Sequence, residues 1–229
     1  MNNYYLNVVS FLFGLSYATT NVFGETPSIP PQISPFPENI TYTLEFLNEP
    51  EEEAQLSQRA IERIHIIQRG TDHYAKVSYT SGRTREYWIK DGYSISPASE
   101  TVYSIIKASS NYRPYPYYSS SFLGHEIVED QNYQGISPTP EGENHHYFKS
   151  RFQTAQILND PSARSEEKSS HVWLDTKTLK PSFWQHENTK IKIQYESARR
   201  AIPPLSDAAK TAWKRFNREQ TLLNKMRMN

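Results

Sequence analysis

The side chains best suited to bind a ligand in this chain are aromatic. Trp88, Trp173 and Trp184 each lie in a segment that alternates between apolar and polar residues, and Tyr103 lies in another. An indole ring offers a large apolar surface and one N–H donor, which suits the wall of a groove that holds an apolar ligand. Ordinary packing inside a hydrophobic core is the alternative interpretation of these residues.

A second group of aromatic residues lies in the proline-interrupted stretch 111–122, where the prolines exclude a regular helix. Its tyrosines are Tyr112, Tyr115, Tyr117 and Tyr118. Such a loop could gate an apolar groove or stack on sugars, whereas a packed surface loop is the simpler alternative.

Catalytic chemistry has little support in the sequence. The motifs of zinc proteases, of serine hydrolases and of phosphate-binding loops do not occur, and the chain has no Cys to act as a nucleophile. His145 and His146, with Glu143, form the best candidate metal site, followed by His125 and Glu126. Adjacent residues of a strand point to opposite faces, however. We therefore expect a protein that is not an enzyme, with no metal and no cofactor.

The charge balance and the absence of Cys restrict the partners. The chain has 25 basic and 25 acidic residues, so uniform attraction to nucleic acid is not expected. Without Cys there is no disulfide and no thiol that could be acylated to tether the protein to a membrane. The charge is uneven, because residues 199–229 have a net charge of +6 and residues 114–148 have five acidic residues but no Lys or Arg. The basic tail could attract this acidic region or an anionic partner.

The first 24 residues contain no Asp, Glu, Lys or Arg and resemble a leader peptide. An apolar run, Leu6–Leu15, is followed by small residues that allow cleavage after Ala18 or Gly24. The run is too short to cross a membrane, which takes about 20 apolar residues. We therefore expect a cleavable signal peptide at 1–24, a periplasmic or secreted protein, and no membrane span in the mature chain. A buried N-terminal strand or helix is the alternative.

After the leader, the pattern predicts a proline-rich extended linker at 25–39 and then a long series of strands. Segment 59–68 is ambiguous, but its β-branched residues favour a strand, and 154–170 is expected to be a polar loop. The predicted strands are 40–46, 59–68, 75–79, 84–90, 93–96, 101–107, 126–128, 133–136, 145–151, 171–175, 181–187 and 190–195. Their spacing predicts a mainly β (β-rich α+β) domain at 40–198 with one large antiparallel sheet.

Residues 199–229 predict a basic C-terminal helix. Apolar residues recur every three to four positions from Leu205 to Leu223, and Ser206 is a suitable N-cap. The basic side of this helix could bind anionic lipid headgroups. Docking of its apolar side on the sheet, through Trp213 and Phe216, is the interpretation we prefer.

Two stretches, Tyr87–Tyr103 and Val172–Trp184, resemble segments of the periplasmic outer-membrane lipoprotein-sorting (LolA/LolB-like) superfamily. The shared pattern is an aromatic-hydrophobic-Asp run, a turn and a Pro, and the resemblance extends over about residues 40–197. It implies a curved sheet forming a half-open β-barrel, with helices against its concave apolar face, and an activity that shields acyl chains in transit. No functional residue of the family can be assigned to a position here.

These observations lead to two functional hypotheses. The first is an exported, soluble carrier that binds a lipid, or the acyl chain of a lipidated protein, in a half-barrel groove, because the absence of Cys fits a soluble carrier better than a tethered acceptor. The second is a cell-envelope module that contacts another protein through the Tyr/Pro loop or the basic helix. Whether the C-terminal helix fills the concave face is the observation that most affects this choice.

Overall fold

The computed structural model describes residues 29–47, 60–109, 113–153, 167–197 and 200–228. These residues form eleven strands, two short 3₁₀ helices and one long α-helix, so the fold is mainly β, as expected. The strands are β1 (Asn39–Phe46), β2 (Ile61–Arg69), β3 (Asp72–Tyr79), β4 (Thr84–Lys90), β5 (Tyr93–Pro97), β6 (Tyr103–Lys107), β7 (Tyr133–Pro138), β8 (Asn144–Gln153), β9 (Glu167–Leu174), β10 (Pro181–His186) and β11 (Thr189–Tyr195). The helices are η1 (His125–Ile127), η2 (Asp130–Asn132) and α2 (Asp207–Met228).

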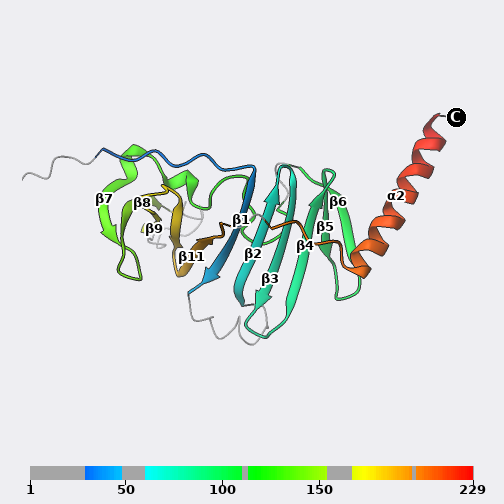
Figure 1. Cartoon of the computed structure of the whole chain (residues 1–229), viewed down its shortest axis with the longest axis horizontal. Coiled ribbons are helices and arrows are strands. Elements are labelled where there is room, and N and C mark those ends of the chain that lie inside the picture. The colour runs from blue at the N-terminus through cyan, green and yellow to red at the C-terminus, as the bar shows by residue number, and fades with distance from the viewer. Residues whose placement is uncertain (1–28, 48–59, 110–112, 154–166, 198–199, 229) are drawn as a thin grey trace, which may run out of the picture.

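All eleven strands belong to one open antiparallel sheet, in the order β6-β5-β4-β3-β2-β1-β11-β10-β9-β8-β7 (Figure 1). Two meanders, β1–β6 and β7–β11, are joined side by side where β1 pairs with β11. In that pair Tyr42 lies opposite Tyr195 and Leu44 lies opposite Ile193. The expected large antiparallel sheet is therefore confirmed, and β6 and β7 are its two edges.

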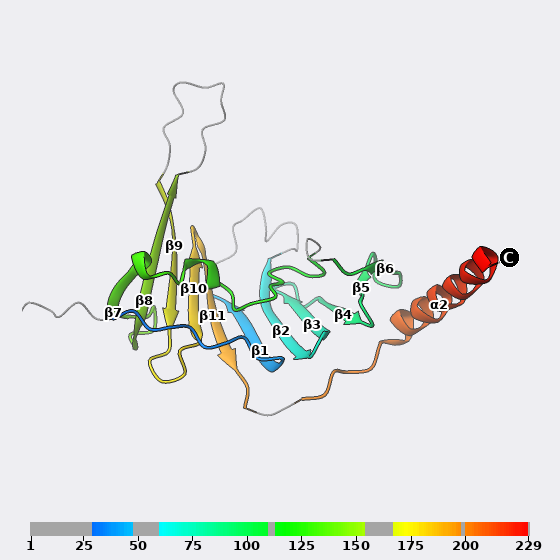
Figure 2. The same ribbon diagram turned by 90° about the horizontal axis from the view of Figure 1, so that it is seen from above.

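This strand order determines the path of the segment between β6 and β7. Eleven strands about 4.8 Å apart make a sheet roughly 48 Å wide. The 25 residues 108–132 can extend over about 85 Å, which is enough to cross that width. Figure 2 shows the described part of this segment from residue 113 to 132, here called the crossover, passing over the sheet towards β7.

The two faces of the sheet are covered by different parts of the chain. One face, here called the core face, carries Leu44, Ile64 and Val77 and packs against the crossover. The opposite face, here called the helix face, carries Tyr74 and Trp88 and packs against α2 and the segment before it. Because side chains alternate along a strand, the choice of face at each position follows directly from the register.

The C-terminal helix docks on the helix face beside β5 and β6 and leaves the core face to the crossover. Ala209 of α2 is fully buried, and the rings of Tyr93 and Phe216 are 4.9 Å apart. Ser206 caps the helix, accepting a hydrogen bond from the Ala209 N–H at 3.4 Å. The docking expected from the apolar side of the helix is present in its first half.

Two local predictions were wrong. Residues 126–128, predicted as a strand, form most of η1 and its C-cap instead. There the left-handed conformation of Gly124 starts a turn that places Ile127 against Phe148 and Leu174. The predicted loop 154–170 contains the beginning of β9, which starts at Glu167, while 154–166 lie outside the described residues.

The proline-rich segment before β1 is extended in its described part, 29–38, and it packs against the body of the protein. Ile33 and Phe36 pack against the core cluster. Ser34 donates hydrogen bonds to the carbonyl oxygens of Leu179, through its N–H at 3.1 Å, and Thr178, through its hydroxyl at 2.6 Å. This part of the predicted linker therefore belongs to the folded domain.

Gly124 provides a test of how tightly the crossover packs. Its φ is +83°, and an added Cβ would lie 2.4 Å from Val172 Cγ2 and 2.6 Å from Trp184 Cδ1. We expect Gly124→Ala to lower the free energy of unfolding by about 3 kcal/mol, combining backbone strain with overpacking. The matched control is Gly142→Ala, with φ +91° and nothing within 4 Å, which should cost only about 1 kcal/mol. Urea denaturation measures the free energy of unfolding of both variants. Equal decreases would contradict the close packing of Gly124 against Val172 and Trp184.

Candidate functional site

The core face carries the largest cluster of buried apolar side chains in the described part of the chain. Its members on the strands, here called the apolar floor, come from β1, β2, β3, β4 and β11. They are Ile40, Tyr42, Leu44, Ile64, Ile66, Ala75, Val77, Tyr87, Ile191 and Ile193. The floor results from the alternation in each of these strands, and the β1–β11 pair makes it continuous across the two meanders.

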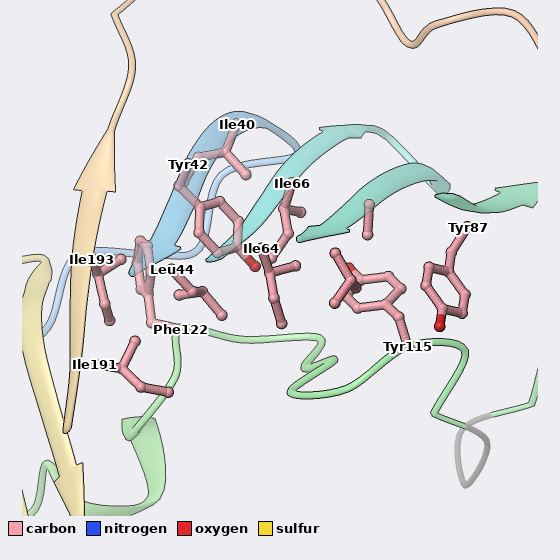
Figure 3. Packing of buried hydrophobic residues seen from close by; sticks show 12 residues of the cluster. Ile40, Tyr42, Leu44, Ile64, Ile66, Tyr87, Tyr115, Phe122, Ile191 and Ile193 are labelled. Atoms are coloured by element: carbon pink, nitrogen blue, oxygen red, sulfur yellow. The ribbon is translucent and has the colours of Figure 1, made fainter. Parts of the chain in front are cut away.

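The crossover covers this floor with aromatic rings, here called the aromatic cover: Tyr115, Tyr117, Tyr118 and Phe122. Tyr115 and Phe122 are each only 4% exposed. Figure 3 shows both side chains directed from the crossover towards the strands, with Phe122 beside Leu44 and Ile191. The core face is thus a layered apolar site in which irregular backbone supplies one layer.

The cover packs on the strands of the core face through ring contacts. Tyr115 lies 6.1 Å from the ring of Tyr87, and Phe122 lies 5.8 Å from that of Tyr195. A third contact, at 5.0 Å, joins Tyr117 to Phe46. The Phe122–Tyr195 and Tyr117–Phe46 pairs are edge-to-face, and such pairs contribute roughly 0.5–1.5 kcal/mol each beyond the burial of apolar area.

Hydrogen bonds contribute little to holding the cover in place. Among the described residues, residues 113–123 of the crossover accept one hydrogen bond from the sheet, from Ser96 Oγ to the Pro114 carbonyl oxygen at 3.3 Å. The other backbone bonds in this stretch are local, such as that from the Tyr118 N–H to the Tyr115 carbonyl oxygen at 3.2 Å. The cover is therefore attached mainly by its side chains.

Two polar atoms beneath the cover lack a hydrogen-bond partner. Among the described residues, the buried side-chain atoms without one are His73 Nδ1 and Trp184 Nε1. Both side chains belong to the core face, and both touch the cover. His73 lies 5.6 Å from the ring of Tyr118, and Trp184 lies 6.2 Å from that of Tyr117. Buried polar groups normally have a hydrogen-bond partner, so two unpaired atoms in one place set the core face apart from the rest of the described structure.

Ionisable groups in the site remain uncharged near neutral pH. Burial raises the pKa of the Tyr42, Tyr115 and Tyr195 hydroxyls well above the usual value for tyrosine. Burial also lowers the pKa of His73, an effect that the nearby Asp72 carboxylate partly opposes. The neutral forms of these groups suit a ligand that is apolar along most of its length.

The structure brings together four of the residues that the sequence predicted to bind a ligand. Trp184 lies on the core face, where it joins the floor to a neighbouring cluster around Phe148. Tyr115, Tyr117 and Tyr118 lie over it in the cover. Tyr112, the fourth predicted loop residue, lies outside the described residues.

Three predicted groove residues lie elsewhere. Trp88 and Tyr103 are on the helix face with their rings 6.1 Å apart, and the Trp88 indole N–H donates to the Pro203 carbonyl oxygen at 3.2 Å. Trp173 is on the same side of the sheet but at its far end, where its indole donates to the Pro138 carbonyl oxygen and its ring stacks on Tyr147. The predicted aromatic residues therefore do not line a single groove.

Local sequence patterns did not single out several residues of the site, notably His73 and Phe122. Neither residue has a local sequence signal. His73 belongs to the site because of how β3 pairs with its neighbours, and Phe122 because of the path of the crossover. The alternation in β11 places Ile191, Ile193 and Tyr195 on one face of the strand, but it does not identify β1 as the neighbouring strand.

The two histidines of the candidate metal site point in different directions. His146 Nδ1 lies 2.9 Å from the Tyr133 hydroxyl, whereas His145 Nε2 lies 3.7 Å from Asp175 Oδ2. Within the described residues, no group of three or more His, Asp or Glu side chains could hold a metal ion. No described helix is long and apolar enough to cross a membrane.

No protein-family model matches the chain. No curated protein sequence matches it either. Among solved structures, the crystal structure of the Mycobacterium tuberculosis lipoprotein LppX is similar, with a TM-score of 0.39 and 9% sequence identity, over 72% of this chain and 88% of LppX. This is a weak fold relationship and says nothing about function. Membership of the lipoprotein-sorting superfamily therefore stays a prediction.

Replacing individual tryptophans tests the difference between the two faces. Trp88→Phe removes a satisfied indole N–H and leaves a void, so we expect it to lower the free energy of unfolding by about 2–3 kcal/mol. Trp184→Phe leaves a similar void but also removes an unpaired buried donor, which costs about 1–3 kcal/mol in the native state. We therefore expect a loss of under about 1 kcal/mol. If urea denaturation gave both variants the same decrease in the free energy of unfolding, the Trp184 indole would not be an unpaired buried donor.

The stability of the protein should depend on pH through His73. In the unfolded chain this histidine protonates near pH 6.5, whereas burial lowers its pKa in the folded state. As pH falls below about 6.5 the unfolded state takes up the proton first, so the free energy of unfolding decreases. We expect His73→Phe to reduce this decrease between pH 7 and 5, as measured by urea denaturation. If the variant kept the pH dependence of the unchanged protein, His73 would not be its source.

Proposed function

We propose that this protein binds a long apolar ligand, such as the acyl chain of a lipid or of a lipidated protein, on the core face of its sheet. The ligand occupies space that the aromatic cover fills in the ligand-free form. The observation that carries the proposal is the attachment of the cover, which rests on aromatic side chains and on a single described hydrogen bond from the sheet to residues 113–123.

The free energies favour such an exchange. Burying a side chain such as that of Phe122 or Tyr115 stabilises the closed form by about 2–3 kcal/mol each. Each methylene of an acyl chain that enters the same space contributes about 0.8 kcal/mol, so a buried run of ten contributes roughly 8 kcal/mol. A chain of that length can therefore displace both rings with a net gain.

The two unpaired nitrogens give the site a preference for a ligand with a polar end. The Trp184 indole can only donate a hydrogen bond, and His73 Nδ1 is also available. A carbonyl or ester oxygen in the space that the cover leaves would accept the bond from Trp184. Pure hydrocarbons would leave both atoms unpaired and are expected to bind less tightly.

The same arrangement favours ligand binding over use of the Tyr/Pro loop as a contact surface for another protein. Tyr115 points into the core and is almost completely buried, so it presents no ring to a partner.

A carrier role also requires export. That part of the proposal depends on the sequence of residues 1–24, because residues 1–28 lie outside the described part of the structure.

A fluorescent polyene fatty acid, titrated into the full chain, tests the proposal. We expect saturable binding, and faster amide hydrogen exchange in 113–123 when the probe is bound, because the cover is displaced. Phe122→Ala weakens the cover and should tighten binding about tenfold or more. The matched control is Phe216→Ala, which removes the same side chain from the helix face and should leave the affinity unchanged.

Failure to bind the probe would overturn the proposal. So would binding that leaves exchange in 113–123 unchanged and has the same affinity in both phenylalanine variants. Urea denaturation of each variant, run in parallel, identifies any gain in binding that comes only from partial unfolding.

A further inference from the structure

The second half of α2 extends beyond the sheet that its first half packs against. Figures 1 and 2 show the helix leaving β6 and projecting away from the body of the protein. Residues 221–227 are all exposed. Three of them are large and apolar: Leu222 (53% exposed), Leu223 (43%) and Met226 (68%). No other element of the described structure packs over these residues.

Basic residues follow the helix on the side opposite the docked face. At 3.6 residues per turn, Lys214, Arg218 and Lys225 form one row about half a turn away from the buried Ala209, and Lys210 lies at the edge of this row. All four of these basic side chains are exposed. The row therefore faces solvent along the whole length of α2.

The apolar side chains of the last turns lie beside this row. Leu222 and Met226 are one turn apart and adjacent to Arg218 and Lys225, and Arg227 lies on their other flank. The single acidic residue nearby, Glu219, already pairs with Arg215 at 2.9 Å. The projecting part of α2 thus presents a small apolar patch with basic residues on both flanks.

We propose that this projecting part of α2 docks the protein on an anionic membrane surface. The apolar patch enters the region between headgroups and acyl chains, and the basic residues bind lipid phosphates. A protein partner is less suited to this helix, because a coiled coil needs three to four heptads of apolar positions and this patch covers about one turn. The inference is independent of the ligand proposed for the core face.

Vesicle co-sedimentation of the full chain tests the docking. We expect binding to phosphatidylcholine vesicles that contain one third phosphatidylglycerol, little binding to phosphatidylcholine alone, and loss of binding at high salt. Each basic side chain near the surface should strengthen binding about fivefold, which corresponds to about 1 kcal/mol. The double variant Arg218→Glu and Lys225→Glu should therefore weaken binding at least 25-fold. The matched control is Lys107→Glu, at the exposed end of β6, which should have a small effect.

Insertion of the apolar patch can be measured separately, because the chain has no Cys. A Met226→Cys variant, labelled with an environment-sensitive dye, should shift to shorter emission wavelength on anionic vesicles. Ile136→Cys on β7, an exposed apolar position at the other edge of the sheet, should not shift. Equal binding to both vesicle types, no effect of the charge reversals, or self-association through α2 in sedimentation equilibrium would each overturn the proposal.

Discussion

The pairing of β1 with β11 is the constraint on which the rest of the structure depends. By placing Tyr42 opposite Tyr195, it joins two local meanders into one sheet and sends β6 and β7 to opposite edges. The chain must then cross the whole sheet between these two edges. The crossover therefore covers the core face as a consequence of topology, and the C-terminal helix is left to pack on the other face.

The unusual composition of the crossover follows from this position. A continuous helix of 25 residues would span only about 38 Å, too short to cross ten inter-strand spacings, and Pro114 and Pro116 prevent a regular helix in the first part of the crossover. Because its backbone is not part of the sheet, its side chains must supply the contacts. Tyrosine suits this task, since its ring packs on the floor while its hydroxyl can reach water or a polar group. The result is a core in which one layer is held more weakly than the sheet.

Local sequence patterns predicted most of the strands but could not predict the site. Alternation identifies a strand from its own residues, which is why the strands around Trp88 and Trp184 were found correctly. Which face each residue occupies depends on pairing between strands far apart in sequence, and a shift of one residue exchanges the faces. Trp88 and Trp184 therefore looked equivalent in the sequence yet lie on opposite faces. The strand predicted at 126–128 failed for a related reason, because the conformation of Gly124 and the cluster around Ile127 determine that turn.

The contrast between the two faces is the physical basis for proposing a binding site on only one of them. On the helix face the Trp88 indole is satisfied by the Pro203 carbonyl oxygen, and Ala209 is fully buried in a packed contact. On the core face the Trp184 indole and His73 Nδ1 remain unpaired beneath rings that no regular secondary structure holds. Each unpaired buried group costs about 1–3 kcal/mol, a cost that an oxygen atom brought by a ligand could remove. Among the described residues, the buried side-chain atoms without a hydrogen-bond partner thus lie on the core face alone, and this difference is why the proposed ligand is placed there.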